Sequence, residues 1–433
     1  MDNIALLLLQ IIVILLASRM VGYLFRFFHQ PQVMGEMIAG ILLGPSLLGW
    51  VSPDIFSFLF PKNSLDSLNA ISQLGLILFM FLVGLELDVS SIRKNGGKAL
   101  LISHTSIIFP FFLGSSLALI LYPQLSNNSV SFLNFAIFIG TAMSITAFPV
   151  LARILSERKL INTVMGSISL ACAAIDDVTG WILLAVVVVL ARSSTMDTHI
   201  LLTIFGLLLF VVLILFVFRP IFKKLGENFE KNGKITHDFL AILFLFLLLS
   251  SWVTEELGVH ALFGAFMIGV AMPKDNQFVH ALTEKINDVA VVLFLPIFFA
   301  LTGLNTSINL IDTPQLWLYA ILIILVAILG KFGGATVAAR ISGMSWRDSG
   351  SVGVLMNTRG LMELVLLNIG LEIGVISPAL FSMLVLMTLT TTFMTAPVLE
   401  WIYFARVRPK QYQPANSVKE LETSEVITAL KLE

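Results

Sequence analysis

Charged residues are scarce in this sequence, and their scarcity excludes most soluble classes of protein. Only 12% of the 433 residues are Asp, Glu, Lys or Arg, 57% are hydrophobic, and the mean hydropathy is +0.95. Soluble domains carry about 25% charged residues, so this balance predicts an all-α polytopic membrane protein. The net charge of −1 gives no excess of positive charge for nucleic acid, and we expect the lipid bilayer but no nucleic acid as a partner.

Cysteine, metal-ligand clusters and a signal peptide are also lacking. The single Cys172 excludes an internal disulfide. No cluster of Cys and His suggests a metal site, so we expect no resident cofactor. No basic residue precedes the first apolar stretch, 4–25, which is longer than the apolar region of a signal peptide. We therefore expect this stretch to be retained as a membrane helix.

The apolar stretches predict thirteen membrane-spanning helices. They cover roughly residues 4–25, 33–50, 66–87, 98–121, 132–156, 161–191, 199–221, 237–255, 257–273, 286–304, 315–340, 347–373 and 377–404. The second and ninth spans are short and interrupted by Gly and Pro, so they are the weakest part of this count.

Basic residues predict the orientation of the chain, because Lys and Arg gather in cytoplasmic loops. The loops after the odd-numbered spans hold sixteen Lys and Arg, and those after the even-numbered spans hold only Lys62 and Arg192. This asymmetry predicts an N-terminus outside the membrane and a short cytoplasmic tail, 405–433.

Two pairs of segments indicate an internal repeat. Residues 39–45, Ala-Gly-Ile-Leu-Leu-Gly-Pro, resemble residues 264–273, and residues 81–88 resemble residues 299–308. Spans 1–6 then map onto spans 8–13, with 199–221 as a linker helix. One half begins outside and the other inside, so the repeat is inverted, as in secondary transporters. Chance similarity among apolar, Gly-rich segments is the alternative.

Adjacent carboxylates, Asp176 and Asp177, lie within the apolar run 161–191. An ionisable group at membrane depth is costly and marks a site that holds or moves ions. The alternative is a solvated acidic pair in a re-entrant segment, which the unbroken apolar sequence on both sides disfavours.

The fifth span of each half carries signals that break a helix. Thr141, Ser144 and Thr146 precede Pro149, which lacks an N–H and disfavours helix at the residue before it. The other half carries Asn357, Thr358 and Gly360 at the corresponding place. Broken helices would direct partial charges of both signs to the bilayer centre. A simple proline kink with a Ser/Thr packing face is the alternative.

Buried charges complete the candidate site. Lys331 lies near the middle of its span and needs a carboxylate, for which Asp176 and Asp177 are the candidates. Arg359 and Glu363 lie on one helix face, and we expect this pair to neutralise the broken-helix ends rather than bind an ion.

Three further acids lie toward cytoplasmic ends of spans. We expect Glu36, Glu86 and Asp88 to form a solvated funnel wall rather than an ion site.

These motifs together resemble the monovalent cation/proton antiporter superfamily. They are the Asp176-Asp177 helix, the segment Thr-Ala-Phe-Pro-Val-Leu-Ala-Arg-Ile-Leu at 146–155 and the segment Asn-Thr-Arg-Gly-Leu-Met-Glu-Leu at 357–364. The branch with bacterial and cyanobacterial Na⁺/H⁺ antiporters and plant cation/H⁺ exchangers is the most similar, and the resemblance covers nearly the whole chain.

The resemblance implies a homodimer, no enzyme activity, and a bacterial inner membrane, or a thylakoid membrane if the source is cyanobacterial. It implies a dimerisation part at about 1–90 and 237–304 and a moving core at about 98–191 and 315–404, within a transmembrane domain of 1–404. It implies that Asp177 binds Na⁺, K⁺ or H⁺, that Thr146 helps to coordinate the metal ion, with Ser144 nearby, and that Asp176 pairs with Lys331.

The expected function is exchange of a monovalent cation, Na⁺ before K⁺ or Li⁺, for H⁺ by elevator-like alternating access. The stoichiometry stays open between one and two protons. A proton-coupled symporter of a small solute and a K⁺-selective exchanger are the alternatives. A channel filter of the Thr-Val-Gly-Tyr-Gly type is missing, and an intramembrane aspartyl protease would carry its two aspartates on separate helices.

Two departures from the family pattern concern the tail and one possible ligand. Many relatives carry a soluble regulatory domain after the last helix, whereas 29 residues follow Phe404 here. Ala173 also stands one turn before Asp177, where some relatives place a hydroxyl.

Overall fold

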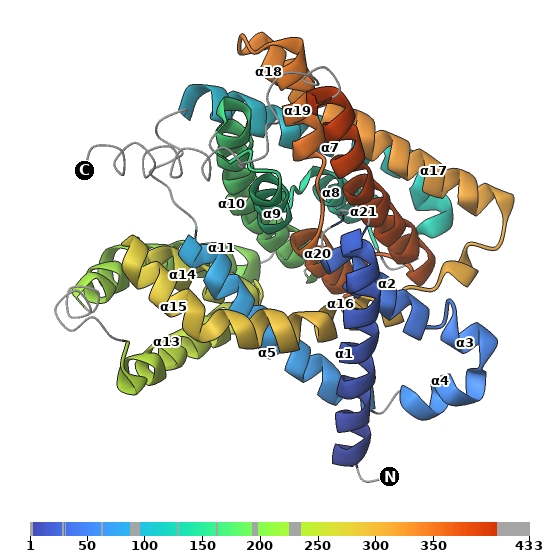
Figure 1. Cartoon of the computed structure of the whole chain (residues 1–433), viewed down its shortest axis with the longest axis horizontal. Coiled ribbons are helices and arrows are strands. Elements are labelled where there is room, and N and C mark those ends of the chain that lie inside the picture. The colour runs from blue at the N-terminus through green and yellow to red at the C-terminus, as the bar shows by residue number, and fades with distance from the viewer. Residues whose placement is uncertain are drawn as a thin grey trace, which may run out of the picture.

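Helices are the only regular elements in the part of the chain that the structure describes. The computed structural model describes residues 3–27, 30, 32–61, 64–86, 96–127, 130–161, 163–192, 198–224 and 235–404. Within these residues all elements are helical (Figure 1), which confirms the predicted all-α class. The tail 405–433, Asp88 and the basic residues Arg93, Lys94, Lys231 and Lys234 lie outside the described residues.

Twelve helical stretches of the described residues are long and apolar enough to cross a membrane. The ninth expected span, 257–273, is the one not among these twelve; it contains α14 (Ala261–Ala271), an apolar helix of 11 residues. At 1.5 Å per residue, α14 extends over only about 16 Å, roughly half of the hydrocarbon core. The predicted count therefore differs by one helix, which is apolar but too short to cross by itself.

Two groups of helices are visible in Figure 1. The upper group holds α7 (Gly96–Leu125), α8 (Phe132–Ser144), α9 (Phe148–Glu157), α10 (Val164–Arg192), α17 (Pro314–Ile328), α18 (Gly334–Ile341), α19 (Trp346–Met356), α20 (Leu361–Glu372) and α21 (Pro378–Leu399). The lower group holds α5 (Leu65–Glu86), α11 (Thr198–Leu213), α13 (His237–Glu256), α14 and α15 (Asn276–Asp288). α1 (Asn3–Phe27), α2 (Gln32–Leu43) and α16 (Leu295–Leu304) lie beside both groups.

Short helices complete the chain. They are α3 (Leu48–Val51), α4 (Pro53–Leu59) and η4 (Ile308–Leu310), and the π-helical turns η2 (Ile214–Phe218), η3 (Val289–Phe294), η5 (Leu329–Gly333) and η6 (Glu400–Phe404). Such π-turns inside α-helices occur frequently at functional sites.

Glycines allow two close helix pairs that are related by the predicted repeat. A Cβ on Gly84 of α5 would collide with the carbonyl oxygen of Phe266 in α14, and one on Gly303 of α16 would collide with Gly40 of α2. The first pair joins spans 3 and 9, and the second joins spans 10 and 2. Because the repeat maps span 2 onto 9 and span 3 onto 10, the two contacts are equivalent, which supports the inverted repeat.

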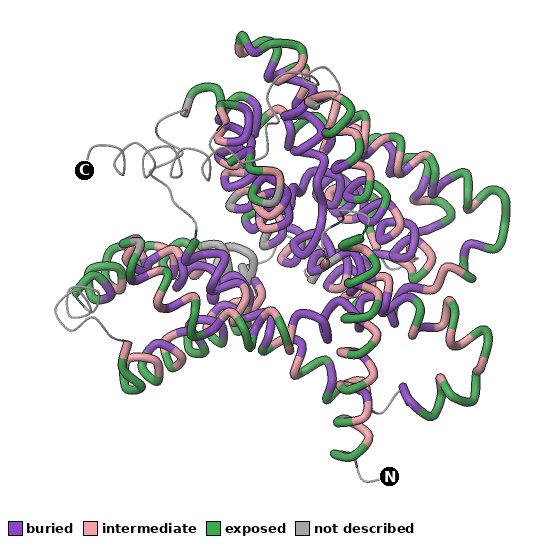
Figure 2. Tube along the Cα trace, in the orientation of Figure 1, coloured by how far each residue is buried: buried purple, intermediate pink, exposed green. Residues whose placement is uncertain are grey.

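The most enclosed segments are the two that the sequence predicts to be broken. In the 18-residue apolar stretch within Trp346–Glu372, 94% of the residues are buried. The corresponding share is 78% within Phe132–Ser156 and 17% within Ile4–Phe27. Figure 2 shows this concentration of buried residues within the upper group.

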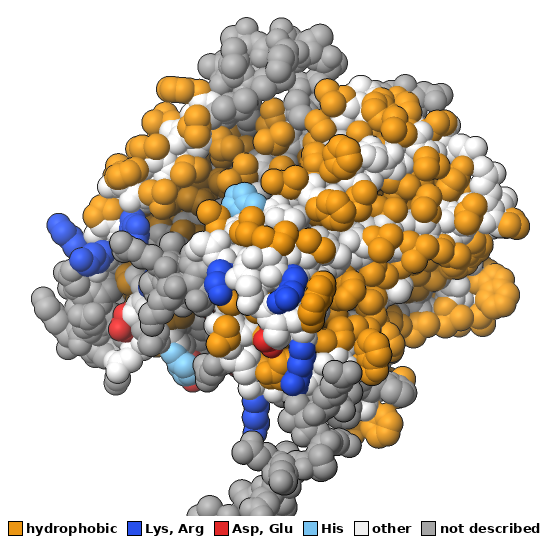
Figure 3. All heavy atoms as spheres, turned by 90° about the horizontal axis from the view of Figure 1, so that it is seen from above, with side chains coloured by type: hydrophobic (Ala, Val, Ile, Leu, Met, Phe, Trp, Pro, Cys, Tyr) orange, Lys and Arg blue, Asp and Glu red, His pale blue; other side chains and the backbone are white. Residues whose placement is uncertain are grey.

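The outer surface is that of a protein surrounded by lipid. Large apolar side chains such as Phe112, Trp317 and Ile321 are exposed. Figure 3 shows a face that is mostly hydrophobic, with Lys and Arg gathered along one edge. Basic side chains at the border of an apolar belt are expected where a membrane protein meets the cytoplasmic interface.

Candidate functional site: a helix crossing beside two aspartates

The first broken helix is interrupted where Pro149 predicts it. α8 ends at Ser144, Ile145 and Ala147 have extended backbone angles, and α9 begins at Phe148. Pro149 occupies the first turn of α9, where its missing N–H costs no hydrogen bond. The chain therefore passes from one half-helix into the next through three non-helical residues, 145–147.

The second broken helix crosses the first at its own interruption. α19 ends at Met356 and α20 begins at Leu361, which leaves 357–360 between them. The backbone N–H of Ala147 donates to the carbonyl oxygen of Thr358 at 3.0 Å. The hydroxyl oxygen of Thr146 also lies 3.1 Å from the carbonyl oxygen of Met356. The two interruptions are therefore hydrogen-bonded to each other in the interior.

Asp176 of α10 lies beside this crossing and is saturated with donors. Lys331 Nζ and the hydroxyl of Thr146 each donate to Asp176 Oδ2 at 2.8 Å. On the other side, the hydroxyls of Ser103 and Ser106 donate to Oδ1 at 2.5 Å and to Oδ2 at 3.1 Å. The side chains of Lys331 and Asp176 are fully buried. The two buried charges therefore neutralise each other, and three hydroxyls add hydrogen bonds to the carboxylate, as a buried ion pair requires.

Lys331 reaches this position from a π-helical turn. It belongs to η5, which interrupts the helix between α17 and α18. A π-turn re-aims the side chains that follow it relative to a regular α-helix, and the pairing with Asp176 is the one that the resemblance implies.

Asp177 has the opposite environment to its neighbour. Its side chain is 0% exposed, and neither carboxylate oxygen has a hydrogen-bond partner within the described residues. The backbone amide of Phe148, the first residue of α9, is near enough to favour a negative charge on this carboxylate, but its geometry falls short of a hydrogen bond. The positive end of a helix favours a negative charge, but a lone buried carboxylate remains costly unless it binds a cation or a proton.

The two hydroxyls predicted to help with the ion have other partners in this conformation. Thr146 is hydrogen-bonded to Asp176 and not to Asp177. The hydroxyl oxygen of Ser144 lies 2.7 Å from the carbonyl oxygen of Gly140 and 3.0 Å from that of Ile107, so its single hydrogen can be donated to either. Ser144 thus joins α8 to α7, and the ligand roles of both residues stay predictions.

Arg359 and Glu363 are arranged as the sequence predicts for charge compensation. The Arg359 guanidinium donates to the carbonyl oxygens of Ala142 and Met143, each at 2.7 Å, and to Glu363 Oε2 at 2.7 Å. Those two carbonyls form the C-terminal end of α8, where a cation is favourable. Both charged side chains are fully buried.

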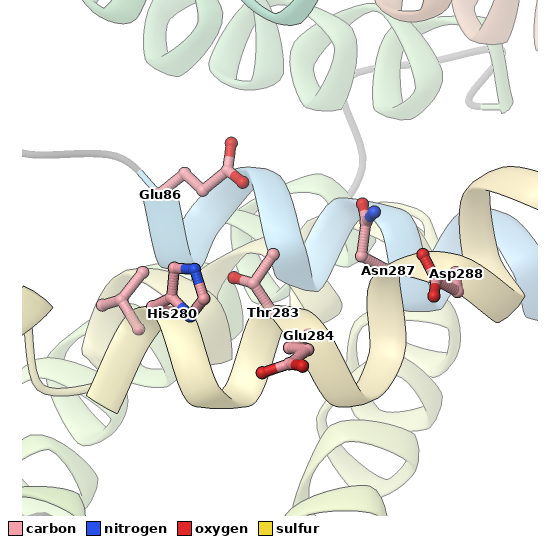
Figure 4. Close-up of a pocket in the computed structure, with 7 residues that line it drawn as sticks. Glu86, His280, Thr283, Glu284, Asn287 and Asp288 are labelled. Carbon is pink, nitrogen blue, oxygen red and sulfur yellow. The ribbon is translucent and has the colours of Figure 1, made fainter. Parts of the chain in front are cut away.

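The predicted funnel wall needs one correction. Glu36 is only 4% exposed and accepts a hydrogen bond from Gln32 Nε2 at 3.0 Å, so the expectation of a solvated side chain is wrong for this residue. The reason is tertiary, because α2 packs against both α1 and α16. Glu86 is exposed as expected and lines a cavity of about 610 Å³ together with residues of α15 (Figure 4).

Sequence reasoning missed Ser103 and Ser106 as partners of Asp176. The one available signal was their spacing of three residues, which places two polar groups on one face of an apolar helix. It does not say which helix they face.

An inverted pair of broken helices that cross beside a lone buried carboxylate defines an ion-coupled secondary transporter. A family model described as the transmembrane part of sodium/hydrogen exchangers matches residues 12–404. The chain belongs to this family, which confirms the resemblance found in its motifs.

Individual relatives have similar sequences. The Na(+)/H(+) antiporter NhaS4 of Synechocystis sp. is 41% identical over 403 residues, which cover 93% of this chain and 98% of that protein. Cation/H(+) antiporter 17 of Arabidopsis thaliana is 41% identical, and K(+)/H(+) antiporter 1 of Saccharomyces cerevisiae is 37% identical. In each of these two comparisons the match covers 92% of this chain but only 48% and 46% of the relative. This chain therefore spans about half the length of the plant and yeast relatives.

A solved structure shares the fold. The sodium proton antiporter MjNhaP1 from Methanocaldococcus jannaschii matches with a TM-score of 0.62 over 92% of this chain and 96% of that chain, at 15% sequence identity.

Proposed function

We propose that this protein is a secondary antiporter that exchanges a monovalent cation for protons across a membrane. The observation that carries the proposal is the asymmetry of the aspartates: Asp176 is saturated by four donors, whereas Asp177 is buried with no hydrogen-bond partner within the described residues. A carboxylate in this state can bind a cation or a proton but not both, and such competition at one site couples the two flows.

The ligand chemistry supports an alkali cation. Hard cations prefer oxygen ligands, and the crossing offers carboxylate, hydroxyl and backbone carbonyl oxygens. Na⁺ is the first candidate because NhaS4, a relative that is 41% identical and matched over 98% of its length, is named a Na(+)/H(+) antiporter. K⁺ is the second, because the yeast relative is named a K(+)/H(+) antiporter and the Bacillus cereus relative a Na(+)/H(+)-K(+) antiporter.

Alternating access would move the crossing relative to the rest of the molecule. The helices of the upper group carry Asp176, Asp177, Lys331 and both broken helices, so we assign them to the moving core. The close glycine-mediated pairs of α5 with α14 and of α2 with α16 belong to the static part, which would also form the homodimer. In this scheme the C-terminus faces the cytoplasm, as the distribution of basic residues predicts.

The test is transport by the purified full chain in proteoliposomes with an imposed pH gradient, acidic inside. Recovery of a pH-sensitive dye on adding Na⁺, K⁺ or Li⁺ is the expected result. A proton-coupled symporter would instead respond to an organic solute and not to a cation. If no monovalent cation dissipates the gradient faster than in protein-free vesicles, cation/proton exchange is wrong.

A further inference from the structure

Eight buried hydroxyl groups have no hydrogen-bond partner within the described residues: those of Ser18, Ser72, Ser169, Ser251, Ser349, Thr283, Thr336 and Thr358. Of these, Thr358 is the one that lies in the interruption of a broken helix. Ten threonines are buried among the described residues: Thr141, Thr146, Thr254, Thr302, Thr306, Thr358, Thr388, Thr391, Thr392 and Thr395. Nine of their hydroxyls donate to a protein oxygen. The tenth, Thr358 Oγ1, has no protein partner within the described residues, although the residue is 0% exposed.

The environment of Thr358 explains why its hydroxyl lacks a partner. Buried threonines in helices usually donate to the carbonyl oxygen four residues earlier, as Thr391 does to Met387 at 2.8 Å. Thr358 lies in the interruption between α19 and α20, where the helical ladder ends. A buried hydroxyl without a protein partner is an exception in native structures, and an ion or a water is a candidate partner for it.

Thr358 lies in the interruption that is hydrogen-bonded to the first broken helix, next to the residues that contact the two aspartates. Its own carbonyl oxygen accepts from Ala147, the residue between Thr146, which contacts Asp176, and Phe148, whose amide interacts with Asp177. On the far side, a Cβ at Gly180 of α10 would lie 3.6 Å from Met362 Cε. Thr358 thus lies in the chain between its own contact with Ala147 of the first broken helix and Met362, which approaches Gly180 of α10.

The neighbouring Asn357 is a weaker candidate although its Oδ1 also lacks a partner. Its Nδ2 lies 3.9 Å from Met394 Sδ, which directs this side chain to α21.

We propose that the hydroxyl oxygen of Thr358 is a ligand of the transported monovalent cation, so that the second broken helix helps to select which alkali cation is accepted. This inference rests on the proposed exchange function. A neutral hydroxyl contributes a dipole without charge, so it changes how well the site fits a cation of given size. It leaves the charge on Asp177, and therefore the competition with protons, in place.

The discriminating variants are Thr358→Val, which replaces the hydroxyl with a methyl group of similar size, and Thr358→Ser, which keeps the hydroxyl. Thr391→Val is the matched control, because it removes a buried hydroxyl from the helical ladder of α21. Each full-chain variant is reconstituted, and KM and maximal rate are measured for Na⁺, K⁺ and Li⁺ separately.

The expected result for Thr358→Val is at least a fivefold rise in KM for the preferred cation, with a changed ratio of KM values among the three cations. The maximal rate should change little. Thr358→Ser should restore both the KM and the ratio, and Thr391→Val should stay within twofold of the unmodified protein.

Two results overturn the assignment of Thr358. One is a Thr358→Val protein with all three KM values within twofold of the unmodified protein. The other is a Thr358→Ser protein that behaves like the valine variant, because the hydroxyl is then not the cause. If the valine variant does not elute as a folded species, Thr358→Ala is used against the same serine comparison. An inactive unmodified protein would instead refute the exchange function itself.

Discussion

Asp176 and Asp177 are adjacent in sequence but have opposite surroundings in the fold. The Asp176 carboxylate accepts hydrogen bonds from Lys331, Thr146, Ser103 and Ser106, whereas the described residues provide no hydrogen bond to Asp177. Because successive residues of a helix point about 100° apart, one aspartate faces α7 and η5 while the other faces the start of α9. Asp176 therefore forms the structural ion pair, whereas the carboxylate of Asp177 is available for an ion.

Replacing Asp177 with asparagine should abolish exchange of every cation while the protein stays folded. The amide has nearly the same shape but neither binds a proton nor carries the negative charge. Dye recovery in proteoliposomes measures exchange, and size-exclusion chromatography checks the fold. Asp54→Asn is the control, because Asp54 is an exposed acid in the first turn of α4. Cation-dependent recovery at the unmodified rate in the Asp177 variant would contradict the assignment.

The buried pair of Lys331 and Asp176 predicts voltage-sensitive exchange. If cation binding at Asp177 breaks the pair, Lys331 releases a proton in addition to the one from Asp177, and two protons exchange for one cation. An imposed membrane potential should then shift the Na⁺/H⁺ reversal point. The double change Asp176→Asn with Lys331→Gln removes both charges together and should make residual exchange insensitive to voltage. If the reversal point of the unmodified protein depends only on the Na⁺ and H⁺ gradients at every imposed voltage, the exchange is one for one and this prediction is wrong.

Arg359 predicts a large loss of stability on substitution. Arg359→Met removes the donors to Ala142 and Met143 and leaves Glu363 as an unpaired buried charge, which costs about 3–5 kcal/mol. The control is Arg158→Gln, whose partner Glu400 has a 60% exposed side chain, so its loss should cost about 0–1 kcal/mol. Unfolding in detergent against temperature compares the two. Equal midpoints of unfolding for the two variants would show that the buried ion pair contributes no more stability than the surface pair.

Cysteines introduced on opposite faces of the membrane should differ in their reaction with an impermeant thiol reagent. Gln124 lies in the last turn of α7 and Lys223 follows η2, and both are exposed. In whole cells, an impermeant thiol reagent should modify Gln124→Cys from outside but not Lys223→Cys, because the loop after 219 is rich in Lys and Arg. The native Cys172 is buried and should stay unlabelled. Labelling of Lys223→Cys alone would reverse the orientation.

Sequence patterns predict the parts of this site that depend on local chemistry. Pro149 predicts where the first helix breaks, and the carboxylates in an apolar run predict the depth of the site. The partners of Asp176 on α7 could not be predicted, because Ser103 and Ser106 are more than 65 residues away along the chain and their contact depends on how α7 packs against α10. The burial of Glu36 and the missing partner of Thr358 are likewise properties of packing.

The bond between Ala147 and Thr358 has a consequence for movement. Together with the two bonds from Arg359 to the end of α8, it ties four half-helices into one body across their crossing. Opening the crossing would leave several backbone groups without partners in a dry interior, and each would cost about 1–3 kcal/mol. Sliding the crossing as a whole breaks none of these bonds. We therefore expect the side of the membrane that reaches Asp177 to change by displacement of the entire assembly, with the groups around Asp177 kept together.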